Sequence, residues 1–175
     1  QSEIAGDRQV TVKVGSMVLK QTITVKFTSN QVATAEISTS GVKKVGELVT
    51  VGITLLNADQ LPVSGQQVEV LVEPDEGVIL TQTKEVSDDQ GQLEAQLLSE
   101  RAGLKTVKLK VGNAELDVNA SLIFQAGPVD KVKISADKGS LLPQQTALLT
   151  LTVVDQYGNP LKGQAPKVQT TLGEL

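Results

Sequence analysis

The chain has 175 residues and a formal net charge of −4, and it contains neither cysteine nor histidine. These absences exclude disulfides, thiolate nucleophiles, Cys/His zinc sites and a histidine general base. The acidic charge and an aromatic content of only 2% also argue against a nucleic-acid partner, which would need a basic surface and rings that stack on bases.

Apolar and polar residues alternate in several short segments, which is the pattern of half-buried β-strands. The first such segment, residues 10–27, is interrupted at Gly15-Ser16 and predicts a hairpin. A second hairpin is expected at residues 107–124, with its turn at Gly112-Asn113. The spacing of valine, leucine and isoleucine predicts further strands at residues 49–55, 68–72, 93–97 and 149–153.

The two hairpin segments are copies of one another. VTVKVGSMVLKQTITVKF (residues 10–27) aligns without a gap with VKLKVGNAELDVNASLIF (residues 107–124), at an offset of 124 − 27 = 97 residues. A turn-rich segment also recurs, as LLNADQLPVSG (residues 55–65) and VVDQYGNPLKG (residues 153–163), at an offset of 163 − 65 = 98. Recurrence at a nearly constant spacing is typical of tandem repeats.

This period divides the chain into three parts. We expect residues 1–30 to be the C-terminal part of one repeat, residues 31–127 a complete repeat, and residues 128–175 the N-terminal part of the next, all belonging to a longer array. About seven short strands in such a repeat predict an all-β, immunoglobulin-like β-sandwich. The segments between the repeats are too short to act as flexible tethers. We therefore expect tandem sandwiches arranged head to tail as a rod.

The turn-rich segments resemble those of a known family, bacterial Ig-like domain 1, which is the repeat of intimin- and invasin-type surface proteins. Residues 153–163 fit every fixed position of its pattern D-x-x-G-N-P-x-x-G, namely Asp155, Gly158, Asn159, Pro160 and Gly163. In the middle repeat only Pro62 and Gly65 of this pattern are retained, while Asp88 and Gly91 stand where the family has a second turn. The resemblance implies a module of an outer-membrane adhesin in which a barrel anchors the protein, Ig-like repeats project outward and terminal domains bind the host.

The polar residues of these segments are interpreted as structural turns. Aspartate at such a position bonds to its own backbone, and glycine supplies a positive φ. The earlier copy has Asn, Gln and Leu in place of Asp155, Gly158 and Asn159, so it does not keep the oxygens that a shared ligand site would need. Asp88 and Asp89 resemble the start of a hand-type calcium loop, but its twelfth position has no glutamate. We expect no cofactor and no such metal site, and interdomain calcium of another geometry remains open.

Other charged groups are assigned to the solvated surface. Glu73, Asp75 and Glu76 form the densest acidic group, with Glu85 nearby in sequence. Paired carboxylates hydrolyse glycosides in some enzymes, but no aromatic residue lies near this group in the sequence to stack on a sugar, so we expect no enzyme. The lysines are expected on outward faces, where they discourage pairing of exposed strand edges, at positions 43, 44, 105, 108 and 110.

The sequence thus predicts non-catalytic stalk repeats of a bacterial cell-surface adhesin, which present a distal adhesive domain and have neighbouring repeats of the same chain as partners. One alternative is that the middle repeat itself binds a host-cell or matrix protein through residues 73–77 and 87–91, since loops on a rigid sandwich often carry recognition. Another is an accessory module of a secreted enzyme or a phage fibre. No apolar run approaches the ~20 residues of a membrane span.

The two incomplete repeats carry a further expectation. Each contains only some of the strands of a sandwich, and exposed edges and half-formed cores favour association. We expect the two partial repeats to complete each other, within one molecule or between molecules.

Overall fold

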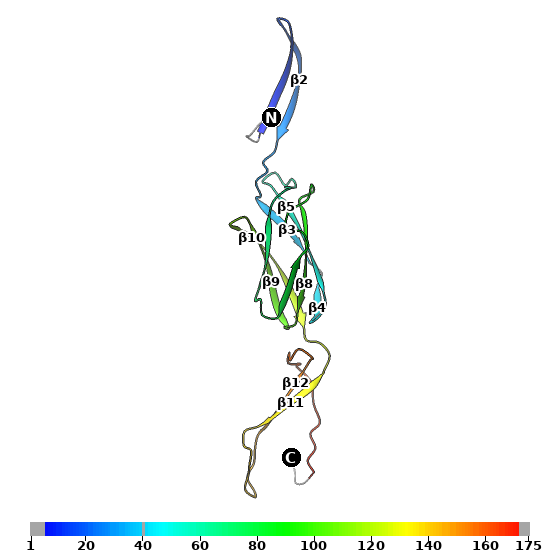
Figure 1. Cartoon of the computed structure of the whole chain (residues 1–175), viewed down its shortest axis with the longest axis vertical. Coiled ribbons are helices and arrows are strands. Elements are labelled where there is room, and N and C mark those ends of the chain that lie inside the picture. The colour runs from blue at the N-terminus through cyan, green and yellow to red at the C-terminus, as the bar shows by residue number, and fades with distance from the viewer. Residues whose placement is uncertain (1–5, 40, 172–175) are drawn as a thin grey trace.

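The computed structural model describes residues 6–39 and 41–171, and every regular element in these ranges is a β-strand. The strands form three bodies that follow one another along the long axis of the molecule (Figure 1). A hairpin occupies one end, a sandwich of two sheets the middle, and a two-stranded piece the other end. The prediction of an all-β chain is confirmed.

The N-terminal body is the predicted hairpin. It consists of β1 (Gly6–Val14) and β2 (Met17–Phe27), which pair antiparallel from Val14 opposite Met17 to Gly6 opposite Phe27. The turn falls at Gly15-Ser16, as the sequence predicts. Apolar residues of both strands are exposed, because no second sheet among the described residues covers them.

The middle body is a sandwich of two four-stranded sheets. One sheet has the order β3-β5-β8-β7 and the other the order β4-β10-β9-β6. Neighbouring strands are antiparallel except for β4 and β10, which are parallel. The strands are β3 (Thr34–Ser38), β4 (Val42–Lys44), β5 (Val49–Leu56), β6 (Val68–Glu73), β7 (Val78–Gln82), β8 (Gln92–Ser99), β9 (Gly103–Val111) and β10 (Ala114–Gln125).

The core between the sheets is built almost entirely from aliphatic side chains. Alternate residues of the inner strands point inward, so Val51, Ala95 and Leu109 are fully buried. Phe124 at the end of β10 is the one aromatic residue in the buried cluster. β-Branched residues and leucine fill a pleated interior well, so the strands predicted from alternation at 49–55, 68–72, 93–97, 107–111 and 116–124 are confirmed.

Three strands of the sandwich were not predicted. β3, β4 and β7 have three to five residues each and lie at sheet edges. An edge strand buries little apolar surface, so its sequence need not alternate clearly. β4 forms because the rest of the fold places it beside β10, where the N–H of Val45 continues the pairing by donating to the carbonyl of Gln125 (N···O 2.9 Å).

The prediction for the lysines at 105, 108 and 110 is wrong about edge protection, and for Lys105 it is also wrong about the outward position. β9, which carries them, lies between β10 and β6, so it protects no edge. Lys105 is buried, and its ammonium donates to the carbonyls of Pro74 (2.8 Å) and Glu76 (3.0 Å). Burial lowers the pKa of Lys105, against the opposing field of nearby carboxylates. Lys108 and Lys110 do face outward, but they form ion pairs across the sheet with Glu73, Glu115 and Glu69.

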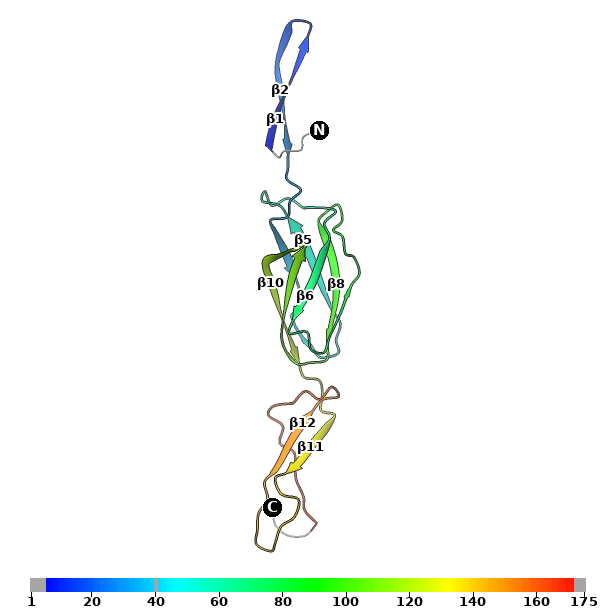
Figure 2. The ribbon, with the colours of Figure 1, turned by 60° about the vertical axis from the view of Figure 1, so that its left-hand side comes forward.

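The C-terminal body contains the antiparallel pair β11 (Lys131–Ala136) and β12 (Leu149–Val154). This body and the β1–β2 hairpin form separate sheets at opposite ends of the molecule (Figure 2). The expectation that the partial repeats complete each other within one molecule is therefore wrong. The physical reason is that a finished sandwich lies between them. Completion between molecules stays a prediction.

The free edge of β6 is covered by a side chain from the opposite sheet. The amide nitrogen of Gln82 donates to the carbonyl of Val68 (2.6 Å), and its amide oxygen accepts from the N–H of Val70 (3.3 Å). The side chain thus occupies the place of a neighbouring strand. Val68 and Val70 are both buried, so these backbone groups have little access to water.

We expect Gln82→Ala to lower the free energy of unfolding by about 1–3 kcal/mol, because a buried donor and a buried acceptor lose their partner. Urea denaturation followed by circular dichroism measures the change. Gln92→Ala, at an exposed position on β8, is the matched control and should have little effect. Equal losses in the two variants would contradict the role given to Gln82.

Candidate functional site

The segment after β12 folds into a tight turn held by one carboxylate. The N–H of Gly158 donates to the carbonyl of Asp155 (3.0 Å), and the N–H of Asp155 donates to the carbonyl of Asn159 (3.1 Å). Oδ1 of Asp155 accepts from the backbone N–H groups of Tyr157 (2.9 Å) and Asn159 (2.8 Å). Gly158 has φ = 84°, a conformation that glycine adopts without strain.

This turn is docked onto the end of the preceding sandwich. The side-chain amide of Asn159 donates to the carbonyl of Glu100 (2.8 Å) and accepts from the N–H of Ala102 (3.0 Å). Both groups belong to the loop between β8 and β9, which is held by the buried hydroxyl of Ser99 through its bonds with the backbone of Arg101. We call residues 99–102 the socket. One asparagine thus joins two successive repeats.

Asp155 also fixes the linker between these repeats. Its Oδ2 accepts from the N–H of Gly127 (2.8 Å) and from the amide of Asn159 (3.0 Å). Asp155 is fully buried. Burial pushes the pKa of this carboxyl up, but the hydrogen bonds from the Asn159 side chain and from backbone N–H groups outweigh burial, so the pKa lies below its usual value. A carboxylate whose two oxygens both accept hydrogen bonds from the protein in this way has a structural role.

Tyr157 provides the apolar part of the contact. Its side chain is partly buried against the core cluster of the middle sandwich. The hydroxyl lies so close to Gly46, in the loop between β4 and β5, that a Cβ added there would be 2.5 Å from it. The absence of a side chain at Gly46 therefore makes room for a residue of the next repeat.

The same turn occurs in the middle repeat, after β5. The N–H of Asn57 donates to the carbonyl of Leu61 (2.9 Å), and Oδ1 of Asn57 accepts from the N–H groups of Asp59 (2.9 Å) and Leu61 (3.0 Å). Nδ2 of Asn57 donates to the carbonyl of Ser29 in the preceding linker (2.8 Å). Asn57 thus takes the place of Asp155, but its side chain donates to the linker, whereas the side chain of Asp155 accepts from it. The sequence interpretation, which saw only the proline and glycine as retained, underrated this residue.

The residues around Asn57 differ from those around Asp155. Asp59 stands at the position of Tyr157 and forms an ion pair with Lys26 on β2 (3.5 Å). Leu61 stands at the position of Asn159 and is 40% exposed. Gln60 adopts φ = 61°, where the later repeat has a glycine.

A third copy of the turn lies between β7 and β8. Oδ1 of Asp88 accepts from the N–H groups of Gln90 (2.9 Å) and Gln92 (2.8 Å), and these bonds lower the pKa of its carboxyl. Gly91 packs against the end of β5 and the segment that follows it, where an added Cβ would lie 2.7 Å from the carbonyl oxygen of Leu55. In residues 6–39 and 41–171 no group of three or more histidine, cysteine, aspartate or glutamate side chains could hold a metal ion.

Pro160 and Gly163 follow the docked turn, and Pro62 and Gly65 follow its earlier copy. Each proline forms an isolated bridge with the last residue of the strand before the turn, Val154 for Pro160 and Leu56 for Pro62. Gly65 donates its N–H to the carbonyl of Ser87 (2.9 Å). These residues fold the chain back along the strand that it has just left.

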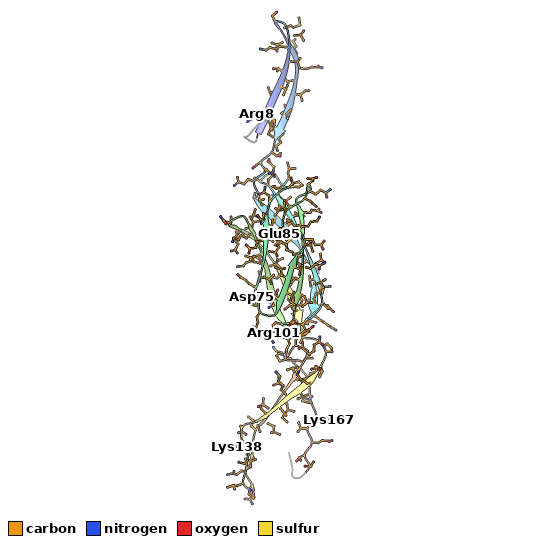
Figure 3. All side chains as sticks on the ribbon, in the orientation of Figure 1. Arg8, Asp75, Glu85, Arg101, Lys138 and Lys167 are labelled. Carbon is orange, nitrogen blue, oxygen red and sulfur yellow. The ribbon has the colours of Figure 1, made fainter. Side chains whose placement is uncertain are left out.

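The acidic residues singled out in the sequence do not gather into one site. Glu73 pairs with a lysine on the sheet, and Glu76 pairs with Arg101 (3.1 Å). Asp75 and Glu85 lie toward opposite ends of the sandwich (Figure 3). The loops at 73–77 and 87–91 are likewise separate, since the carbonyl of Gly77 accepts from Glu100 in the socket and the carbonyl of Gly91 accepts from Leu55 at the other end.

Sequence reasoning missed the socket, although a signal for it exists. Residues 99–103 read S-E-R-A-G, and residues 2–6 read S-E-I-A-G, again 97 positions apart. Residues 2–5 lie outside the described residues. Tyr157 was also missed, because its importance depends on contact with Gly46, which is more than 100 positions away in the sequence. In the part of the chain that the structure describes, no helix is long or apolar enough to cross a membrane.

No known family model matches the chain, and no curated protein sequence matches it. Solved structures do resemble it. FdeC, an Escherichia coli adhesin, is 22% identical with a TM-score of 0.59, over 91% of this chain and 53% of that chain. Invasin, a bacterial integrin-binding protein, is 18% identical with a TM-score of 0.58, over 93% of this chain and 34% of that chain.

Domains 4–9 of the surface layer protein SbsC are 22% identical with a TM-score of 0.53, over 90% of this chain and 25% of that chain. At these identities the likeness shows the fold alone. The chain spans about half of the FdeC structure and smaller shares of the other two. The predicted immunoglobulin-like fold is confirmed, and it is the fold of tandem domains in bacterial surface proteins.

The docked turn should resist mild acid. Because the pKa of Asp155 is lowered in the folded chain, its contribution to docking is fully present above the unfolded value of about 3.9 and is lost as the pH falls through the lower folded value. The chain has one tyrosine and no tryptophan, so tyrosine emission reports on this joint. We expect acrylamide quenching of Tyr157 to stay constant from neutral pH down to about 4 and to rise below it.

Asp155→Asn provides the comparison for this experiment. Its amide group would face the N–H of Gly127 with another donor, so we expect stronger quenching of Tyr157 already at neutral pH and no acid step of the wild-type kind. A wild-type chain whose tyrosine becomes accessible at about pH 6, well above the ordinary carboxyl pKa, would show that Asp155 does not hold the joint.

Proposed function

We propose that this chain is part of the stalk of a bacterial cell-surface adhesin, in which non-catalytic Ig-like repeats hold a distal adhesive domain away from the cell. The repeats are of the bacterial Ig-like domain 1 type and comprise residues 1–30, 31–127 and 128–175. In this proposal the partners of each repeat are its neighbours in the same chain.

The observation that carries this proposal is the docked turn of residues 155–159. β10 ends at Gln125 and β11 begins at Lys131, so the connection is short. Within it, Gly127 is bonded to Asp155, and Asn159 is bonded to the socket. The next repeat consequently continues the long direction of the sandwich (Figure 2). End-to-end docking of this kind suits a spacer, because it converts each added repeat into added length.

The use of buried polar groups supports a non-catalytic role. The described buried polar side chains all have hydrogen-bond partners. Asn57, Lys105, Asp155 and Asn159 each bond to backbone groups of turns or loops. Polar groups in a catalytic site are instead aimed at a cavity where a substrate can reach them.

The resemblance to known structures supports the proposed location. FdeC is an adhesin, invasin binds integrin, and SbsC is a surface layer protein. For this chain we favour the adhesin role, because residues 153–163 fit the turn pattern of the intimin- and invasin-type repeat at every fixed position.

Small-angle X-ray scattering tests the spacer role. The full chain is compared with chains lengthened by one, two and three further copies of residues 31–127. We expect the maximum dimension to rise by roughly 40 Å per copy, since strands of up to about ten residues rise by ~3.3 Å per residue and the end loops add the rest. A particle that stays compact as copies are added would rule out the rod.

A display experiment tests the choice between a spacer and a receptor-binding repeat. The chain is placed between an outer-membrane anchor and a reporter binding domain, and adhesion of the bacteria to reporter ligand and to host cells is measured. We expect reporter-dependent adhesion to survive replacement of loops 73–77 and 87–91. Host-cell binding that needs no reporter and disappears with these loops would favour the alternative function.

A further inference from the structure

β6 is an edge strand, and only part of its free side is covered. It pairs with β9 on one side and has no strand on the other in the part of the chain that the structure describes. The N–H of Val68 donates to the carbonyl of Glu85 (2.9 Å). The carboxamide of Gln82 bonds to the carbonyl of Val68 and to the N–H of Val70. These contacts cover the first half of the strand.

The second half of the same side is open. Along an antiparallel pair, every second residue directs its N–H and its carbonyl away from the partner strand, so Val72 follows Val68 and Val70 in this respect. The carbonyl of Val70 and both backbone groups of Val72 therefore point to the free side. Within residues 6–39 and 41–171 no protein group bonds to them there. Pro74 has no N–H to donate, so the open stretch ends before it.

A groove of about 510 Å³ lies beside these open groups. β6 forms one wall, and Val78 and Leu80 of β7 belong to the other. Both of these side chains are partly buried against the core, so this wall is apolar. Successive side chains of a strand point to opposite faces. An apolar side chain that points inward from an added strand would meet this wall and lose its contact with water.

Gln82 shows which chemical group the edge of β6 binds. Its carboxamide accepts from the N–H of Val70 and donates to the carbonyl of Val68, two residues earlier. The N–H of Val72 and the carbonyl of Val70 form a second pair of the same kind, two residues further on. A peptide backbone is made of amide groups, and an extended segment presents them along one edge. The open half of β6 therefore fits an added strand.

The charges on the outer face of this sheet indicate the side chains that such a strand would carry. Lys108 on β9 pairs with Glu115 on β10 and with Glu73 on β6. Lys110 on β9 pairs with Glu69 on β6. The sign of the charge thus alternates from strand to strand, and the last row, on β6, is acidic. Opposite charges on neighbouring strands stabilise a sheet, so the next strand would carry lysine or arginine on this face.

We propose that the open half of β6, from Val70 to Glu73, binds an extended segment of a partner protein by antiparallel strand addition. The segment alternates apolar side chains, which enter the groove, with basic side chains on the outer face. Antiparallel pairing is the more stable kind per residue. The site needs only the middle sandwich, so the inference does not depend on the proposed stalk role.

Nuclear magnetic resonance of the full ¹⁵N-labelled chain tests the proposal with the end-blocked peptide Lys-Val-Lys-Val-Lys. We expect the amide resonance of Val72 to shift on titration, because its N–H gains an acceptor. The amide of Val70 should shift less, since it is already bonded to Gln82. In the proposed register the N–H groups of the peptide valines point toward β6 and those of its lysines point away. N-methylation of the valines should abolish the shift, whereas N-methylation of the lysines is the matched control that should preserve it.

Two charge reversals test the contribution of the outer face. Glu73→Lys places a cation beside the peptide lysines, so we expect the affinity for Lys-Val-Lys-Val-Lys to fall roughly tenfold. Glu115→Lys is the matched control, because Glu115 also pairs with Lys108 but lies on β10, away from the edge at β6. We expect this variant to lose less than about twofold in affinity.

Three results would overturn the inference: no shift at Val72, a shift that survives methylation of the peptide valines, or equal losses of affinity in the two charge reversals. A Val72 resonance that moves with protein concentration in the absence of peptide would show that a second copy occupies the edge, and would overturn the assignment to a partner protein. Circular dichroism verifies that both variants keep their strands. If Glu73→Lys unfolds, the methylated peptides still test the edge in the wild-type chain.

Discussion

The structure depends on one buried carboxylate. Asp155 loses its water on burial, and such a loss is tolerated only when other donors replace the water. Here the donors come from its own turn, from the linker and from Asn159. Removing this group would leave the turn without its internal support, the linker without an acceptor, and Asn159 free to leave the socket. Asp155 therefore stabilises both its own turn and the contact between this turn and the preceding sandwich.

Because the turn is stabilised from within, its other positions are available for different tasks. The turn at Asp88 packs inside one repeat, the turn at Asn57 meets a linker, and the turn at Asp155 meets a neighbouring sandwich. The three share an aspartate or asparagine at the first position and the backbone bonds of the turn. The contacts that each turn makes can therefore change through the intervening side chains without changing the turn itself.

Sequence reasoning was most successful where the physics is local. In strands such as β5, β9 and β10, apolar and polar residues alternate because one face of the strand is buried. The glycines at the hairpin turns mark where these strands end. Short edge strands such as β4 leave no such trace. The turn pattern around Asp155 was visible, but its partners were not. The side chain of Asn159 bonds to backbone groups of a loop 57 residues earlier in the chain, and the repeat of that loop's sequence does not show what binds to it. Lys105 was misplaced for a similar reason, because its partners are carbonyls.

The cover that Gln82 gives to β6 has a consequence for copies of this domain that stand side by side, as they would in the proposed role. A surface crowded with such molecules would bring many sandwiches of the same kind into parallel contact, and uncovered strand edges would then pair between neighbours. Along β6 the backbone groups of Val68 and Val70 already have an amide as partner. One glutamine thereby gives these two backbone groups a partner within their own domain, which disfavours lateral pairing at this part of the edge.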